Sequence, residues 1–184
     1  MKIEEKISLF SSYLEGRPED SKYFAHRFAL SAGNSLTLEP VDNSYHLADQ
    51  AALLLGLSRL SITLKDADTS FPHDLDTIRE TLWETMESRI DKETGVWLSE
   101  VPLETAEEKT GDVENVTTHL LFAAMAADMA DKADDSWFGS SRYRNRIEKT
   151  VSWLNESSDG TGLIGDTIMA DGTSCEVSFS ATMA

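Results

Sequence analysis

Three segments of the chain carry apolar residues at helical spacing on one face and polar residues on the other. The apolar residues, segment by segment, are Ile3, Ile7, Phe10 and Leu14; Leu75, Ile78, Leu82, Met86 and Ile90; and Ile147, Val151 and Leu154. This spacing predicts amphipathic helices over residues 2–14, 73–91 and 140–156, each with one face on a core and one in water.

Two further segments are apolar around most of their circumference. Residues 45–64 read YHLADQAALLLGLSRLSITL, and residues 113–131 are rich in Ala and Met. A helix that is apolar on nearly all sides must be covered by its neighbours. We therefore expect two inner helices, over 45–64 and 113–131. They alternate along the chain with outer helices that keep one solvent-exposed face.

The remaining segments predict one more helix and several loops. Tyr23, Phe24 and Phe28 favour a helix over residues 20–32, whereas Pro40, Asp42 and their neighbours favour a loop from Leu36 to Ser44. The last eight residues, VSFSATMA, resemble the start of another helix. No strand ladder is required anywhere, and the short apolar runs near Val96 and Leu163 are marginal as strands.

These elements predict an all-α fold of antiparallel helical hairpins. A chain of 184 residues suits one helical domain, residues 1–184. Its 40% of hydrophobic residues excludes disorder along the whole chain.

Charge narrows the range of partners. The formal net charge is −17, with acidic residues spread along the whole sequence. Nucleic acid and anionic membrane are therefore disfavoured as direct partners, because both attract Lys and Arg patches. Three interpretations of the charge stay open: an acidic surface that favours solubility, halophilic adaptation, and mimicry of nucleic acid toward a basic partner.

The longest apolar run, the first ten residues and the cysteine content limit the possible location of the protein and its possible sites. The longest apolar run, Ala51 to Leu57, is shorter than the roughly 18 residues of a membrane span. The first ten residues lack the pattern of a secretory signal, so we expect a cytoplasmic protein. A single cysteine, Cys175, excludes an internal disulfide and a multi-cysteine metal site.

Three segments share one pattern, in which an acidic turn precedes a small-residue helix. They begin at Asp42 (DNSYHLADQAAL), Asp112 (DVENVTTHLLFA) and Asp171 (DGTSCEVSFSAT), with offsets of 69 and 61 residues when Leu47, Val116 and Val177 are aligned. Such a repeat of inner and outer helices is typical of proteins built from stacked helical hairpins.

These turns, together with TGVWL from Thr94 and DGTGLIGD from Asp159, resemble those of the α/α-toroid superfamily. The superfamily includes terpenoid cyclases, prenyltransferases and polysaccharide lyases, and its hairpins surround a central cavity. The resemblance covers residues 40–184 and implies a fold similar to part of such a toroid. A full toroid has five to seven hairpins and this chain holds about three. Three explanations stay open: an incomplete toroid or fragment of a larger ring, a unit that associates, or generic helical hairpins.

The same resemblance implies a site at the N-terminal ends of the inner helices. His119, in the sequence NVTTH, resembles the Asn-His element of toroidal polysaccharide lyases, and Glu176 lies in a turn spaced like a second element of those enzymes. Such a lyase uses a base to remove a sugar proton. The Tyr-His pair expected after Ser178 is absent. The candidate catalytic residues are His119, Glu176, His46, Asp112 and Glu114.

Two other groups offer alternative chemistry. The sequence Asp66-Ala-Asp68-Thr69 resembles the acidic motif with which terpenoid cyclases protonate an alkene. His46 and His119 with a nearby carboxylate could hold a metal, although no His-Glu-x-x-His motif is present. Each group also has a plain structural interpretation, as a loop, a helix cap or a core histidine.

Two functions remain open on the sequence alone. One is an enzyme or enzyme fragment of the α/α-toroid type that acts on a glycan or an isoprenoid. The other is a non-catalytic acidic helical module that binds a protein partner or a second copy of itself. Neither a cofactor nor a metal requirement can be assigned from these residues.

Overall fold

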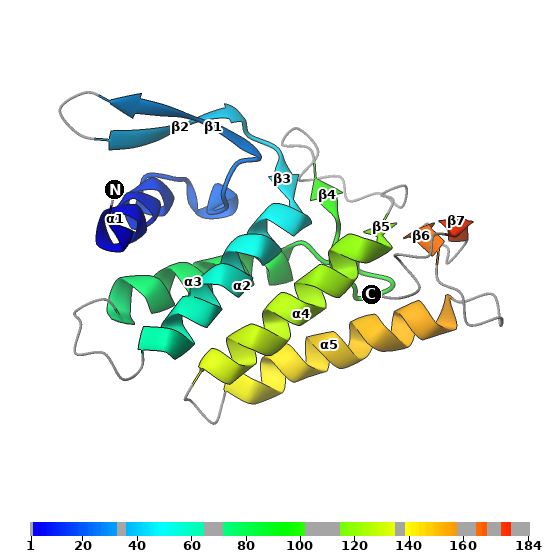
Figure 1. The fold of residues 1–184 in the computed structure, drawn as a ribbon. Helices are drawn as coiled ribbons and strands as arrows, with labels where there is room; N and C mark the ends of the chain where they lie inside the picture. The colour runs from blue at the N-terminus through cyan, green and yellow to red at the C-terminus, as the bar shows by residue number, and fades with distance from the viewer. Residues whose placement is uncertain are drawn as a thin grey trace.

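The computed structural model describes residues 2–32, 36–64, 72–101, 115–134, 139–157, 165–168 and 174–177. In this part of the chain the helices are α1 (Ile3–Glu15), α2 (Leu47–Leu64), α3 (Pro72–Ser88), α4 (Thr117–Ala133) and α5 (Gly139–Glu156). Figure 1 shows α3 running antiparallel to α2, and α5 antiparallel to α4. The predicted helical hairpins are therefore confirmed, with bounds shifted by a few residues.

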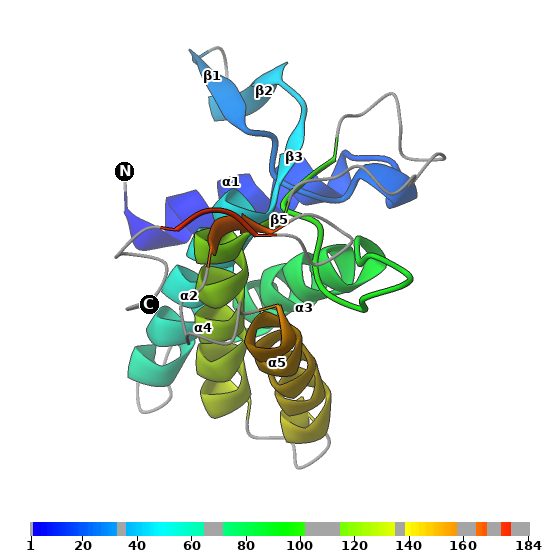
Figure 2. The ribbon, with the colours of Figure 1, turned by 90° about the vertical axis from the view of Figure 1, so that its right-hand side faces the viewer.

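The two inner helices lie side by side and run in the same direction. Both α2 and α4 begin at the same end of the molecule, as the two ribbon views agree (Figures 1 and 2). The alanines of α4 allow a close approach, because four of them are fully buried: Ala123, Ala126, Ala127 and Ala130. In α2, Leu47, Ala51 and Leu54 are also fully buried. The prediction that these two helices form the interior is confirmed.

The outer helices bury one stripe each. In α3 the predicted stripe is confirmed, since Leu75, Ile78, Leu82 and Met86 are at most 1% exposed. In α5 the stripe is only partly as predicted. Leu154 and Tyr143 are buried, whereas Val151 is 42% exposed. The core-facing line of α5 thus runs through Tyr143, Thr150 and Leu154 rather than through Val151.

By length and composition α2 alone, among the described helices, could cross a bilayer. In this fold, however, it packs against both α3 and α4 and supplies much of the hydrophobic core. Its apolar character is therefore accounted for by burial within the protein.

The prediction of a helix over 20–32 and a loop over 36–44 is wrong. A short 3-10 helix (Glu19–Ser21) leads to an antiparallel hairpin of β1 (Arg27–Ala32) and β2 (Leu36–Asp42). Figure 2 shows this hairpin projecting from the helical body next to α1. Phe24 and Phe28 pack with Phe10 and Tyr13 of α1 in a cluster of edge-on and stacked rings, so tertiary aromatic packing outweighs the local helical spacing.

Short strands mark the ends at which the inner helices begin. β3 (Tyr45–His46) pairs with β4 (Glu100–Val101) before α2. A three-stranded sheet lies at the start of α4, with the strand order β5 (Asn115–Val116), β6 (Gly165–Ile168) and β7 (Ser174–Val177). Of these strands, β5 leads directly into α4. The all-α prediction is thus too strict: the fold is mainly helical with small antiparallel sheets. The helix predicted over the last eight residues would begin at Val177, but Val177 is the last residue of β7. The other residues of that segment lie outside the described part of the chain.

The apolar run Val96-Trp97-Leu98 folds back on the end of α3. Trp97 is fully buried and pairs with Ile90 in an isolated antiparallel bridge. Gly95 provides the turn, with a φ of 73° that favours glycine. Trp97 Nε1 donates to Glu87, which also accepts two hydrogen bonds from the Arg146 guanidinium of α5, at 2.7 and 2.8 Å. This bidentate pair connects the two outer helices.

A buried arginine connects α3 with both inner helices. Arg79 is 6% exposed, and its guanidinium donates to Ser58 Oγ of α2 at 3.2 Å, to the Ala130 carbonyl of α4 at 3.1 Å and to Asp76 at 2.9 Å. Since three elements supply acceptors for one cation, truncation would leave Ser58 and the Ala130 carbonyl without this donor.

We predict that Arg79→Ala lowers the free energy of unfolding by about 2–4 kcal/mol, because it removes a buried, fully engaged guanidinium. Arg144→Ala, at an exposed position on α5, serves as the matched control and should change stability by less than about 0.5 kcal/mol. Urea unfolding followed by circular dichroism measures both. Equal stability of the two variants would contradict this role of Arg79.

Candidate functional site

The predicted site residues fall at the end of the molecule where both inner helices begin. His46 is the last residue of β3, directly before α2, and His119 lies in the first turn of α4. Glu176 lies in β7. Asp112 and Glu114 lie outside the described residues, as does the acidic motif at Asp66 and Asp68.

The three-stranded sheet connects β7 with the start of α4. Asn115 and Val116 of β5 pair with Ile168 and Thr167 of β6, and Thr167 pairs in turn with Cys175 of β7. The first residue of α4, Thr117, is fully buried and its hydroxyl donates to the Gly165 carbonyl of β6. The backbone that carries Glu176 is therefore two strands from the backbone that leads into α4 and His119.

His46 is the candidate residue with the most completely described surroundings. Its Nε2 lies 3.0 Å from Ser44 Oγ, and Ser44 Oγ donates to Asp42 Oδ1 at 2.6 Å. The Ser44 amide also donates to Asp42 Oδ1, at 3.1 Å. These two bonds stabilise the charged carboxylate and hold the pKa of Asp42 below its ordinary value of 3.8.

A second histidine, from the segment 20–32 that was predicted to be helical, belongs to the same cluster. The ring of His26 stacks on that of His46, with centroids 4.1 Å apart and planes 28° apart. His26 Nδ1 lies 2.8 Å from Asp49 Oδ2, in the first turn of α2. His46 was a candidate from the sequence, but no local pattern showed that His26 would join it.

Below this surface cluster, the other face of β3 faces the core. Tyr45 is 1% exposed, and burial raises its pKa. The Arg89 guanidinium lies 4.9 Å from the ring centroids of both Tyr45 and Tyr23, and Arg89 also donates to the Asp20 carbonyl at 3.1 Å. These cation–π contacts stabilise the position of Tyr45 in β3, directly before His46.

The described residues contain no group of three or more His, Cys, Asp or Glu side chains that could hold a metal. The metal alternative built on His46 and His119 therefore finds no support in this part of the chain. The cluster of imidazole, hydroxyl and carboxylate groups around His46 is instead suited to hydrogen bonding and proton transfer.

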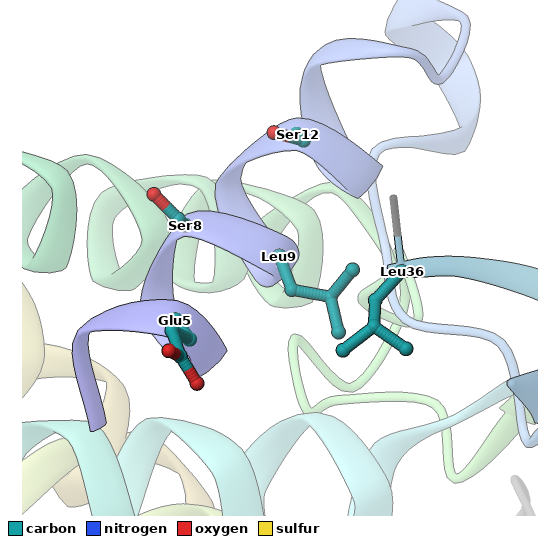
Figure 3. A pocket seen from close by; sticks show the side chains of 5 residues that line it. All are labelled: Glu5, Ser8, Leu9, Ser12 and Leu36. Atoms are coloured by element: carbon teal, nitrogen blue, oxygen red, sulfur yellow. The ribbon is translucent and has the colours of Figure 1, made fainter. Parts of the chain in front are cut away.

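A separate groove runs between α1 and β2. Figure 3 shows Leu9 and Leu36 facing one another there, with Ser8, Ser12 and Glu5 along the helix side. The groove continues toward Tyr13, Arg17, Leu38 and Pro40. Its lining is largely apolar and contains no imidazole, so it offers a contact surface rather than an acid–base site.

Comparison with known proteins shows the fold. No protein-family model matches the chain, and no curated protein matches it. Among solved structures, a crystal structure of D-mannose isomerase is similar over 95% of this chain, with a TM-score of 0.63 and 19% sequence identity. The chain spans about 40% of the length of that isomerase chain. Because that enzyme is of the α/α-toroid type, the likeness supports a distant toroid-like fold.

We predict that Ser44→Ala raises the pKa of Asp42 toward its ordinary value of 3.8, because the hydroxyl donor is lost while the backbone amide donor of residue 44 remains. Since the pKa of Asp42 is lowered in the folded state, this interaction stabilises the fold at pH values above the ordinary pKa. The stabilisation is lost as the pH falls through the lowered pKa of the folded state. Titration of the Asp42 carboxyl carbon by NMR measures the change. The same pKa in both proteins would contradict the Ser44–Asp42 geometry.

Proposed function

We propose that the chain forms a sugar-converting unit of an α/α-toroid-type enzyme, with its site where α2 and α4 begin. The observation that carries the proposal is the parallel pairing of α2 and α4, which puts a histidine at the start of each inner helix. The fold likeness to D-mannose isomerase supports a carbohydrate as the substrate class.

Isomerisation of an aldose to a ketose moves one proton from C2 to the carbonyl carbon C1, and a second proton from the C2 hydroxyl to O1. A neutral imidazole can take the proton from C2 and return it to C1. In our proposal His119 is the base, and His46 binds or polarises a sugar oxygen. Glu176, Asp112 and Glu114 contribute carboxylates that accept hydrogen bonds from sugar hydroxyls.

A sugar suits the described surroundings of His46 better than an isoprenoid does. Ser44, Asp42, His26 and Asp49 surround it with hydrogen-bonding groups. An isoprenoid site instead requires an apolar, aromatic-lined cavity to shield a carbocation. The large aromatic side chains Trp83 and Trp97 are both buried, and they pack on one another with ring centroids 6.0 Å apart.

One observation favours the alternative, a protein-binding module. Leu30, Leu36 and Val41 of the hairpin are 59%, 42% and 65% exposed beside the groove along α1. Exposed apolar side chains of this size mark candidate contact surfaces. A protein partner that binds the wild-type chain and the His46→Ala variant, but does not bind the Val41→Asp variant, would favour this function over the first.

We predict that His46→Ala and His119→Ala each lower kcat/KM for D-mannose conversion by about 100-fold or more, because both act in one proton-transfer site. Met125→Ala, at a half-exposed position of α4, is the control and should keep wild-type activity. A coupled sugar assay measures the rates, and thermal unfolding checks that the variants fold. Wild-type protein that neither binds nor converts D-mannose or a related monosaccharide would contradict the proposed function.

A further inference from the structure

We infer that two pairs of residues, Ser44 with Asp42 and His26 with Asp49, position His46 by fixing its tautomer and its ring plane. This inference rests on the proposed function, in which His46 acts on a sugar oxygen. It adds four residues to the site, none of which is among the five candidate catalytic residues predicted from the sequence. Each contributes through His46 rather than by touching the substrate.

The tautomer follows from the order of the hydrogen bonds. A carboxylate can only accept, so the single hydroxyl proton of Ser44 goes to Asp42 Oδ1, 2.6 Å away. Ser44 Oγ is then the acceptor toward His46 Nε2 at 3.0 Å, and Nε2 must carry a hydrogen. In the neutral ring, Nδ1 is therefore the acceptor nitrogen.

The low pKa of Asp42 agrees with this order, since it keeps the carboxylate charged and thus unable to donate. Arg27 adds positive charge on the same carboxylate, with a nitrogen 3.6 Å from Asp42 Oδ2. The relay Asp42–Ser44–His46 thus has one direction, from the imidazole hydrogen to the carboxylate.

The ring plane of His46 is set by the stacked ring of His26. His26 Nδ1 must donate to Asp49 Oδ2 at 2.8 Å, because the carboxylate accepts, so neutral His26 is held as the Nδ1–H tautomer. Asp49 lies on α2 and His26 lies before β1, so this hydrogen bond connects the stacked ring of His26 to α2. A ring packed flat against a hydrogen-bonded neighbour cannot rotate without breaking that contact.

The segment before His26 is attached firmly to α2. Gln50, which is fully buried, accepts a hydrogen bond from the Phe24 amide at 3.0 Å and donates to the Phe24 carbonyl at 2.7 Å. This two-bond pairing fixes the backbone two residues before His26. The backbone near His26 is therefore held by Gln50, and the backbone of His46 is held by the pairing of β3 with β4.

This cluster lies at the surface, where a substrate can reach it. The His26 and Asp49 side chains are 40% and 39% exposed. Surface hydrogen bonds and ion pairs contribute little to stability. The variants below should therefore fold, and a loss of positioning can be measured apart from a loss of structure.

The tautomers are tested in alkaline solution by two-bond 1H–15N correlation spectra of the histidine-labelled chain, without sugar. We expect His46 as Nε2–H and His26 as Nδ1–H, the tautomer that free histidine disfavours. Asp49→Ala should return His26 to the Nε2–H form, and Ser44→Ala should reduce the preference of His46 for the Nε2–H form. Asp128→Ala, which removes a comparable exposed ion pair with Lys132 on α4, should leave both rings unchanged.

The functional part is tested by the same variants in the sugar assay. Ser44→Ala and His26→Ala should lower kcat/KM at least 10-fold with only a small change in melting temperature, whereas Asp128→Ala should leave kcat/KM unchanged. Wild-type His46 as Nδ1–H or as a mixture would overturn the inference, whatever the sugar result. Unchanged kcat/KM in Ser44→Ala would also overturn it. Expected tautomers in a wild-type chain that converts no sugar would instead count against the proposed function.

Discussion

The close, parallel packing of α2 against α4 is the constraint on which the rest of this structure depends. Small side chains on α4, such as Ala126 and Ala127, let two helices that are apolar on most sides cover one another. Because these helices run in the same direction, the chain must return between them, and α3 does so. Helix α5 returns in the same way after α4, and both outer helices keep one solvent-exposed face. The shared direction also puts both helix N-termini, and the short strands before them, at one end of the molecule.

That end of the molecule concentrates the polar chemistry. Strands β3 and β5 lead the chain into α2 and α4, so His46, directly before α2, and His119, in the first turn of α4, both lie near the start of an inner helix. Helices whose apolar surface is already buried leave their N-terminal ends as the natural location for ligands, because unpaired amides and polar side chains gather there. The segment that leads into β1 adds His26 to this end from a different part of the sequence.

The sequence predicted what depends on periodicity and missed what depends on contacts between distant residues. The stripe through Ile78 and Leu82, and the apolar character of α2 and α4, placed the helices and separated inner from outer ones. The spacing of Phe24 and Phe28 suggested a helix, yet these rings pack on α1 from extended backbone. Likewise, the position of His46 followed from the repeat, whereas the stack on His26 requires the hairpin to fold back over 20 residues, a contact that local patterns do not encode.

The parallel direction of α2 and α4 can be measured by electron–electron distance spectroscopy on spin labels at exposed or partly exposed helix positions, with Cys175→Ser removing the native thiol. One label at Thr63, near the end of α2, is paired with a second at Lys132 or at Thr118, near the end and the start of α4. The account predicts a short Thr63–Lys132 distance and a Thr63–Thr118 distance longer by roughly 20 Å, since a helix rises about 1.5 Å per residue. The reverse order of the two distances would show antiparallel inner helices and would contradict both the fold and the shared site.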